Sequence, residues 1–312
     1  MSDPTTVTST SQVGTMGERH VARPRSSWRR IHRGAISLLW ALAGIGLTIL
    51  MWELVKWLGG VVSLPFDTSD SVMPHVWTML EGFGDPEVRG SDTTVFQAVL
   101  FAALRSLFIA LGGFVIGVSF GLLLAIIMQR FAFMERGLLP FVIASQTVPL
   151  IATAPLIVGI GNRVSIGPFQ WGTTQSVMFI AAYLAFFPIS VGALRGLKAP
   201  SATALELMRS YAATPRQMLW KLRFPASVPF LIPAIKVSAA GAVVGTVVAE
   251  ISTGVKGGIG RLVLEYAREA TASPAKVYVA VFGAIALGLT VAALVTVLDL
   301  YLTRNLPKEG AA

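Results

Sequence analysis

The chain has 312 residues, of which 54% are hydrophobic and 13% charged, and its mean hydropathy is +0.69. A soluble domain carries roughly a quarter charged residues, so this composition excludes an ordinary soluble enzyme and a disordered chain. The sequence contains no cysteine, which excludes disulfides, thiolate metal sites and cysteine nucleophiles. We therefore expect an all-α protein that crosses a membrane several times.

The N-terminal segment differs from the rest of the chain. It is polar, rich in Ser and Thr, and has no hydrophobic period before the basic residues that end at Arg33. We predict a disordered, basic cytoplasmic tail over residues 1–33, followed by a transmembrane region at 34–304 and a short C-terminal tail at 305–312.

Six stretches are apolar and long enough to cross a hydrocarbon layer of roughly 30 Å. The predicted spans cover about 36–58, 100–128, 138–161, 173–194, 233–251 and 277–302. Gly167, Pro168 and Gly172 precede the fourth span, so we expect a loop or short re-entrant segment there and a helix that begins near Thr173. Lys236 lies near the start of the fifth span, where its long stem lets the ammonium reach the interface.

The distribution of basic residues predicts the orientation. With both termini in the cytoplasm, 16 of the 25 Lys and Arg residues lie on the cytoplasmic side and about seven on the opposite side. This bias follows the positive-inside rule. The net charge of +9 is therefore interpreted as a topology signal, and we expect no nucleic-acid partner.

Signs of catalysis are weak in this sequence. No lysine is followed by Ser or Thr, so the chain has no Walker A loop, and its three histidines lack the spacing of metal ligands. Gly117, Ser119 and Gly121 spell a GxSxG pattern, which elsewhere marks a nucleophile. Here the pattern lies inside an apolar span, where small residues are typical of helix packing. We predict no catalytic residue and no metal site.

The longest cytoplasmic connection, residues 195–228, has the pattern of two short helices, and we call it the coupling segment. Leu205 and Met208 have helical spacing, with Glu206 and Arg209 at positions i and i+3. Two helices joined by a tight turn on the cytoplasmic face favour a docking surface for another protein, although a passive loop also fits.

The second of these helices has a clear start signal. Thr214 is a predicted N-cap, Pro215 a first helical residue, and Gln217 completes a capping box. We expect this helix to run from Pro215 to about Leu222 and to end before Phe224 and Pro225, because the residue before a proline disfavours helix.

The coupling segment resembles the EAA motif of bacterial ABC importer permeases. Glu206 stands at its Glu position, Ala212 at its Gly position, Leu222 at its Ile, and Phe224-Pro225 at its Leu-Pro, while Leu207-Met208 replaces the two alanines. A left-handed backbone at alanine costs free energy, so we expect Ala212 to be right-handed or the turn to shift by one residue.

The resemblance covers roughly residues 55–304 and includes three further runs. They are Gln146 to Leu156, Phe187-Pro188-Ile189 ahead of Leu194 to Leu197, and Val248-Ala249-Glu250 ahead of Gly257 to Gly260. These runs look like the branch of permeases for sulfonates, taurine and nitrate, with relatives for thiamine-precursor pyrimidines and riboflavin. An extra stretch near Asn162 to Trp171 departs from the sulfonate pattern.

This resemblance implies a type I ABC importer fold with about six transmembrane helices in the bacterial plasma membrane. It implies a second copy of this permease, two cytoplasmic ABC ATPases that bind ATP and Mg²⁺, and an external substrate-binding protein, with no cofactor on this chain. The implied function is ATP-driven import of a small organic solute by alternating access. The cargo suggested is a pyrimidine-type vitamin precursor, riboflavin, or a sulfonate- or nitrate-like anion.

Two sets of residues are candidates for this function. The predicted ATPase-coupling residues are Glu206, Arg209, Ser210, Tyr211, Ala212, Ala213, Thr214 and Pro215. The predicted translocation-path residues are Gln146, Thr147, Pro149, Tyr183, Phe187, Thr246 and Glu250.

The path residues have alternative interpretations. Polar groups in hydrocarbon are costly, which favours Gln146 and Glu250 in a path, but Glu250 can equally cap the outer end of the fifth span. Helix packing explains Tyr183, Phe187 and Thr246 as well as a path does. An ion-coupled secondary transporter and a membrane-embedded enzyme are the rival classes.

Overall fold

The computed structural model describes residues 27–62, 65, 67–88 and 90–303. Most of the predicted N-terminal tail and all of the predicted C-terminal tail lie outside these residues. The chain divides into two units, Met1–Leu54 and Val55–Ala312. Helix α1 (Ser27–Val61) begins in the first unit, where most of its described large apolar side chains are exposed, Trp40 by 75%.

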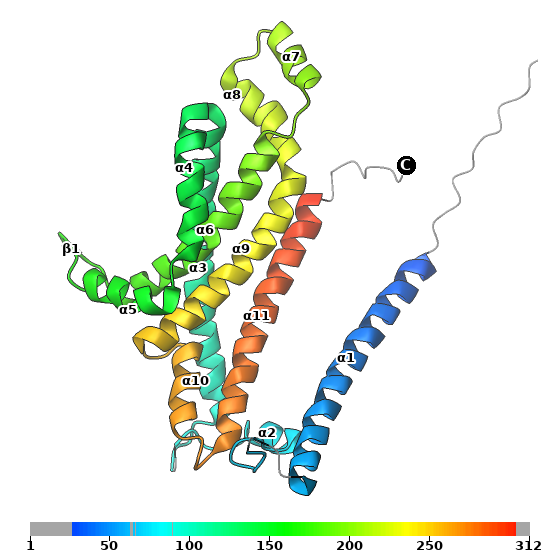
Figure 1. The fold of residues 1–312 in the computed structure, drawn as a ribbon, viewed down its shortest axis with the longest axis vertical. Helices are drawn as coiled ribbons and strands as arrows, with labels where there is room; N and C mark the ends of the chain where they lie inside the picture. Colours follow the sequence, from blue (N-terminus) through cyan, green and yellow to red (C-terminus); the bar gives the residue numbers. More distant parts are fainter. Residues whose placement is uncertain (1–26, 63–64, 66, 89, 304–312) are drawn as a thin grey trace, which may run out of the picture. The chain divides into compact units, whose positions relative to one another are not determined.

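Four long helices form the centre of the second unit. They are α3 (Val95–Arg130), α6 (Thr173–Leu197), α9 (Phe224–Thr253) and α11 (Pro274–Thr303) (Figure 1). Helix α6 packs most extensively, because it contacts both α3 and α9 along their lengths. Its start at Thr173 agrees with the sequence prediction.

Shorter elements connect and flank these helices. They are α2 (Val76–Glu81), α4 (Ala132–Ala144), η1 (Ser145–Thr147), α5 (Leu150–Gly161), β1 (Ser165–Ile166), β2 (Phe169–Gln170), α7 (Ala202–Ser210), α8 (Pro215–Met218), the π-helical η2 (Leu219–Arg223) and α10 (Ile259–Arg268). The two strands form a small antiparallel hairpin in which Ser165 pairs with Gln170.

The close contact between α3 and α6 explains the GxSxG pattern. A Cβ atom on Gly117 would lie 2.6 Å from the carbonyl oxygen of Ala182, and one on Gly121 would lie 2.6 Å from that of Phe186. Glycine lets the two backbones approach, as in other helix pairs within membranes. The pattern is therefore a packing feature of α3.

Five helices of the described chain are long and apolar enough to cross a membrane, and a sixth span results if α4 to η1 and α5 are counted together. The predicted all-α class with about six spans is thus confirmed. The sixth is not a straight helix, since Ala132–Thr147 and Leu150–Gly161 are bent by 103°.

Proline chemistry explains this bend within the predicted span at 138–161. Pro149 has no backbone N–H, and the preceding Val148 takes the extended conformation that a following proline favours, with φ −69° and ψ 123°. The helix ends at Thr147 and restarts at Leu150, so the predicted span is broken near its middle.

The expected end of the second coupling helix before Pro225 is wrong. Phe224 is right-handed helical, with φ −66° and ψ −48°, and α8, η2 and α9 follow each other without a gap from Pro215 to Thr253. The π-helical turn shifts the hydrogen-bond register directly before Pro225, which has no N–H to donate. Helix α9 accordingly starts nine residues before the predicted position 233.

Candidate functional site

The coupling segment lies at one end of the second unit, opposite α2 and α10 (Figure 1). Its two ends are held together where the segment leaves and re-enters the bundle. Arg223 Nη1 donates a hydrogen bond to the carbonyl oxygen of Leu197 at 2.9 Å. Gly196 faces Ser227 so closely that a Cβ atom on Gly196 would lie 2.7 Å from the serine Cβ. The segment therefore has a fixed base and a projecting tip.

Both short helices of the tip are capped by neighbouring side chains. Ser201 Oγ accepts a hydrogen bond from the Ala204 N–H at 3.2 Å. Thr214 Oγ1 accepts from the Gln217 N–H at 3.3 Å, while Gln217 Oε1 accepts from the Thr214 N–H at 2.8 Å. This reciprocal pair is the predicted capping box, and it satisfies two N–H groups that a helix start leaves unpaired.

The turn between the two helices corrects one prediction. Ala212 is left-handed, with φ 51°, and is the one non-glycine residue of the described chain with positive φ. The Ala213 N–H donates to the Met208 carbonyl at 3.0 Å and the Ala212 N–H to the Arg209 carbonyl at 2.9 Å. These two bonds form a Schellman motif, which requires a left-handed residue at the position of Ala212. The expectation of a right-handed or shifted turn was wrong because the two hydrogen bonds outweigh the steric cost of the Cβ atom.

The tip presents apolar and charged side chains together. Every residue of α7, all of them described, is exposed or half-buried, including Glu206 and Arg209. Leu207 is 58% exposed and Tyr211 78% exposed. Exposed aromatic and aliphatic groups beside charges are characteristic of surfaces that bind another protein. The predicted coupling residues, Glu206 and Arg209 to Pro215, are all exposed or half-buried.

Three of the predicted path residues lie at the break between α4 and α5. Gln146 and Thr147 belong to η1 and are exposed, and Pro149 caps the start of α5. The Tyr183 hydroxyl of α6 donates a hydrogen bond to the Ser145 carbonyl, which fixes the break against the bundle. The structure therefore brings Tyr183 together with η1, while the half-buried Phe187 lies one turn further along α6.

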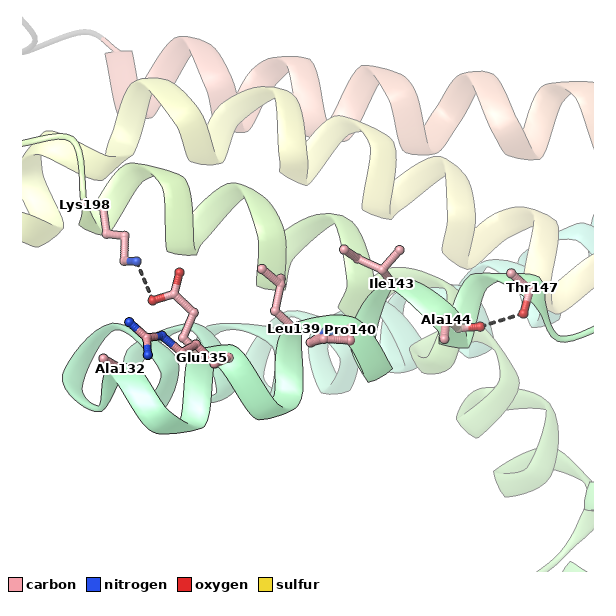
Figure 2. Close-up of a pocket in the computed structure, with 9 residues that line it drawn as sticks. Ala132, Glu135, Leu139, Pro140, Ile143, Ala144, Thr147 and Lys198 are labelled. Atoms are coloured by element: carbon pink, nitrogen blue, oxygen red, sulfur yellow. Dashed lines mark hydrogen bonds and ion pairs between the residues drawn. The ribbon is translucent and has the colours of Figure 1, made fainter.

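Thr147 also lines a cavity of about 850 Å³ that follows α4 (Figure 2). Leu139, Pro140 and Ile143 lie along its length, and Glu135 and Lys198 face each other at its other end. The sequence analysis did not single out this cavity.

Thr246 and Glu250 are placed differently from the other candidates. Both are fully buried within the described unit. The Thr246 hydroxyl donates to the Ala242 carbonyl of its own helix at 2.9 Å, so it is satisfied locally. Neither side chain lines the cavity along α4.

Glu250 joins three helices. Its Oε1 atom accepts a hydrogen bond from Ser106 Oγ of α3 at 2.7 Å, and its Oε2 atom accepts from the Gly260 N–H of α10 at 2.9 Å. Ser106 Oγ in turn accepts from the Ile259 N–H at 2.9 Å. We call Glu250, Ser106 and the N–H groups of Ile259 and Gly260 the α9–α10 joint. A carboxylate at a helix N-terminus is favoured by the helix dipole, so Glu250 caps the start of α10 rather than the outer end of its own helix.

Sequence reasoning missed Ser106, although a hydroxyl inside an apolar span was a usable signal. The joint also explains the glycine at position 258, because a Cβ atom there would lie 2.2 Å from the Glu250 carboxylate. The glycine-rich run that follows Glu250 therefore makes room for the carboxylate at the start of α10.

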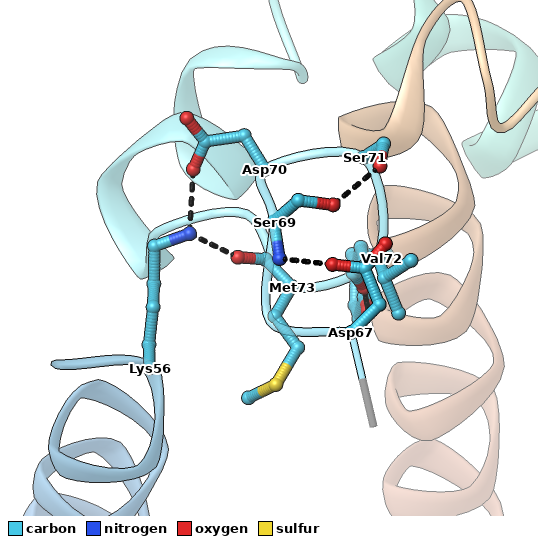
Figure 3. A network of polar contacts seen from close by, with 8 residues as sticks. Lys56, Asp67, Ser69, Asp70, Ser71, Val72 and Met73 are labelled. Atoms are coloured by element: carbon cyan, nitrogen blue, oxygen red, sulfur yellow. Dashed lines mark hydrogen bonds and ion pairs between the residues drawn. The ribbon is translucent and has the colours of Figure 1, made fainter. Parts of the chain in front are cut away.

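A polar network orders the loop that precedes α2 (Figure 3). Lys56 Nζ donates to Asp70 Oδ1 at 2.5 Å and to the carbonyl of Met73. The hydrogen bond from Lys56 lowers the pKa of Asp70, and the Ser69 N–H, which donates at 2.8 Å, lowers the pKa of Asp67. Both carboxylates stay ionised at neutral pH, so this loop presents negative charge at the end opposite the coupling segment.

No group of three metal-ligating side chains occurs in the part of the chain that the structure describes. The site is thus a capped helix pair at one end, a broken helix beside a cavity, and a buried carboxylate that ties three helices.

Comparison with known proteins identifies the family. The model of the binding-protein-dependent transport system inner membrane component matches residues 117–308, more than half of the chain. The chain is 24% identical over 215 residues to a probable ABC transporter permease protein of Haemophilus influenzae, covering 69% of this chain and 78% of that protein.

Two further relatives carry more specific names. A formylaminopyrimidine transport permease protein of Halalkalibacterium halodurans is 32% identical over 138 residues, covering 44% of this chain and 52% of that protein. A putative aliphatic sulfonates transport permease protein of Bacillus subtilis is 27% identical over 218 residues, covering 70% of each chain. The chain therefore belongs to the binding-protein-dependent transport system inner membrane components, and is an integral, multi-pass permease subunit of an ABC importer rather than an enzyme.

Proposed function

We propose that two copies of this chain form the membrane pathway of an ATP-driven importer in a bacterial plasma membrane. Two ABC ATPases bind ATP and Mg²⁺ on the cytoplasmic side, and an external binding protein delivers the solute. Both termini and the coupling segment lie in the cytoplasm in this arrangement. The positive-inside bias supports this orientation, because the coupling segment alone carries six of the Lys and Arg residues.

The observation that carries the proposal is the exposed helix pair at the tip of the coupling segment. Glu206, Arg209 and Tyr211 project from capped helices, so a partner meets a surface that is already ordered and loses little conformational entropy on binding. Because α8 continues into α9, movement of a docked ATPase passes directly into a spanning helix. ATP-driven closure then becomes a rocking motion of the bundle and gives alternating access.

The broken helix supports a solute path beside η1. Broken helices within a membrane are tolerated where they line a cavity, and such sites bind solutes in other transporters. Gln146, Thr147, Pro149 and Tyr183 are assigned to this path, with Phe187 one turn away, while Thr246 and Glu250 shape the helices around it.

The proposed cargo is a pyrimidine-type vitamin precursor, riboflavin, or a sulfonate- or nitrate-like anion. The relatives' names support part of this range, since they print formylaminopyrimidine, aliphatic sulfonates and riboflavin. Specificity then resides chiefly in the external binding protein. Transport of radiolabelled candidates into proteoliposomes that contain the complete complex identifies the cargo.

The test of the coupling surface is a matched pair of double variants. Glu206→Ala with Arg209→Ala removes both charges from the tip, whereas Arg261→Ala with Glu265→Ala removes the same residue types from the ion pair on α10 at the other end. The full-length chain is purified together with its ATPases, and bound ATPase and ATP-dependent uptake are measured.

We expect the tip variant to lose most of the bound ATPase and the α10 variant to retain it. Equal ATPase binding by the tip variant and the unaltered protein contradicts the assigned surface. Uptake that persists without ATP contradicts the class and favours an ion-coupled transporter.

A further inference from the structure

The cavity along α4 has one charged end and one apolar length (Figure 2). Leu139, Pro140 and Ile143 form the apolar length, and Thr147 closes it at η1. Glu135 and Lys198 lie at the end nearest the coupling segment, and Arg136, which follows Glu135 in the chain, also lines the cavity. This combination fits an amphiphile with a polar head and a hydrocarbon tail.

The charges at that end leave one guanidinium to bind an anion. Glu135 Oε2 and Lys198 Nζ form an ion pair, so these two residues largely neutralise each other. Arg136 has no ion-pair or hydrogen-bond partner among the residues that the structure describes, and its side chain is exposed. A free guanidinium presents several N–H donors in a planar fork, which suits phosphate oxygens.

The length of the cavity matches one half of a bilayer. From Glu135 to Ala144, α4 rises about 14 Å at 1.5 Å per residue, and half of a 30 Å hydrocarbon layer is about 15 Å. Large apolar side chains on the same helix are exposed, Phe133 by 80% and Phe141 by 75%. Helix α4 is thus placed to run through one leaflet, with its charged end at the interface.

We propose that this cavity binds an anionic phospholipid. The phosphate contacts Arg136, beside the Glu135–Lys198 ion pair, and one acyl chain lies along Leu139 and Ile143. The proposal rests on the orientation given under the proposed function, which puts this end in the cytoplasmic leaflet, where anionic lipids attract basic residues. A free phosphate would leave the apolar length of the cavity unfilled, so this lining favours a lipid over a free phosphate.

The position of Lys198 gives the lipid a role. Lys198 caps the end of α6, and only Ala199 and Pro200 separate it from Ser201, the N-cap of α7. A headgroup bound to Arg136, beside the Glu135–Lys198 ion pair, therefore lies at the base of the coupling segment. Anionic lipid should stabilise that base and favour docking of the ATPase.

The absence of cysteine from the sequence permits a clean test. Ile143→Cys in the cavity and Leu289→Cys on α11 are matched positions, since both side chains are apolar and exposed, by 54% and 65%. Each full-length variant is labelled with a fluorophore and reconstituted, without ATPase, in vesicles of phosphatidylcholine and phosphatidylglycerol. Either lipid carries bromine on its acyl chains as a quencher.

We expect brominated phosphatidylglycerol to quench the label at 143 more strongly than brominated phosphatidylcholine, and both lipids to quench equally at 289. Arg136→Gln should weaken the preference at 143 about fivefold, the effect of one cation near a membrane surface, about 1 kcal/mol. Arg195→Gln removes the same charge at the same end but outside the cavity lining, and should leave the preference intact.

Three results overturn the proposal. Equal quenching by both lipids at 143 shows a non-selective surface, and no quenching by either shows that protein, such as a second copy, covers the cavity. An equal loss of the phosphatidylglycerol preference at 143 in Arg136→Gln and Arg195→Gln shows that anionic lipid is attracted to this end in general. The measurement needs no ATPase, so its outcome is independent of whether the coupling surface is assigned correctly.

Discussion

The two ends of the second unit satisfy their polar groups in opposite ways. At the tip of the coupling segment the bonds are local, as between Thr214 and Gln217, and the side chains face solvent. At the α9–α10 joint the bonds are long-range, and Glu250 is fully buried among groups from three helices. Local bonds keep a segment folded while it moves, whereas long-range bonds hold helices in fixed positions. The tip therefore keeps its local fold without support from the bundle, whereas the joint depends on three helices at once.

The substitution Glu250→Ala tests the difference between the two ends most directly. The substitution leaves Ser106 and the Gly260 N–H buried without their acceptor, and it opens a space between α9 and α10. We expect a loss of about 3 kcal/mol in the free energy of unfolding, since a hydrogen bond to a charged group is worth up to that amount. Unfolding by denaturant in detergent measures the loss.

Glu265→Ala is the control for this experiment, because its side chain is 43% exposed and pairs only within α10. It should cost under 1 kcal/mol. Similar losses in the free energy of unfolding for the two variants would show that burial of the Glu250 carboxylate has no special role.

Tyr266 on α10, at the same end as the joint, makes the stability of the protein depend on pH. Burial raises the pKa of Tyr266 to about 12, above the ordinary value of 10, and nearby Glu87, Glu269 and Glu265 raise it further in the same direction. The folded state therefore holds its phenolic proton more tightly than the unfolded state. The contribution of Tyr266 to the free energy of unfolding is fully present below pH 10. It is lost between pH 10 and pH 12, by about 1.4 kcal/mol per pH unit.

Tyr266→Phe should remove this alkaline loss, measured as the difference in thermal unfolding between pH 9 and pH 11. The Tyr266 hydroxyl is buried and has no hydrogen-bond partner among the described residues. The variant should therefore be as stable as the unaltered protein, or slightly more stable, at neutral pH. An unchanged loss at pH 11 would assign the alkaline transition to another group.

The change in stability that we expect at the tip is smaller than those at the joint. Ala212→Gly relieves the left-handed alanine, which costs roughly 1 kcal/mol, without removing either bond of the Schellman motif. Slower hydrogen exchange at the amides of residues 212 and 213 than in the unaltered protein measures the gain in stability of the turn. Ala213→Gly, a neighbour outside the positive-φ position, should speed exchange instead.

If both glycine variants speed exchange, chain flexibility rather than relief of the left-handed alanine governs the turn. In that case strain at the left-handed alanine would not be a distinguishing feature of the tip.

The sequence predicts the features that rest on local patterns. The start of α6 at Thr173 and the capping box of Thr214 depend on neighbours within three or four residues, and both are found in the structure. The left-handed Ala212 was missed because propensity was weighed against a turn whose two hydrogen bonds only the folded segment reveals.

The joint and the broken helix show a different limit. Ser106 and Glu250 are 144 residues apart, and no local pattern links them. The break at Pro149 was present in the sequence as a proline, but helices within membranes often continue through proline, as α9 does at Pro229 and Pro233. Hydrogen bonding in the surrounding structure decides between these outcomes.

The uninterrupted course from α8 through η2 into α9 has a mechanical consequence. Helix α9 alone is about 45 Å long at 1.5 Å per residue, and no loop separates the tip from the joint at its far end. A displacement of α8 is therefore not absorbed by a flexible linker. The points along this continuous helix that bend most easily are the π-helical turn and the prolines at 229 and 233, all near the α8 end. Bending should therefore be concentrated there, while the half of α9 near the joint moves as one body with its contacts to α3 and α10.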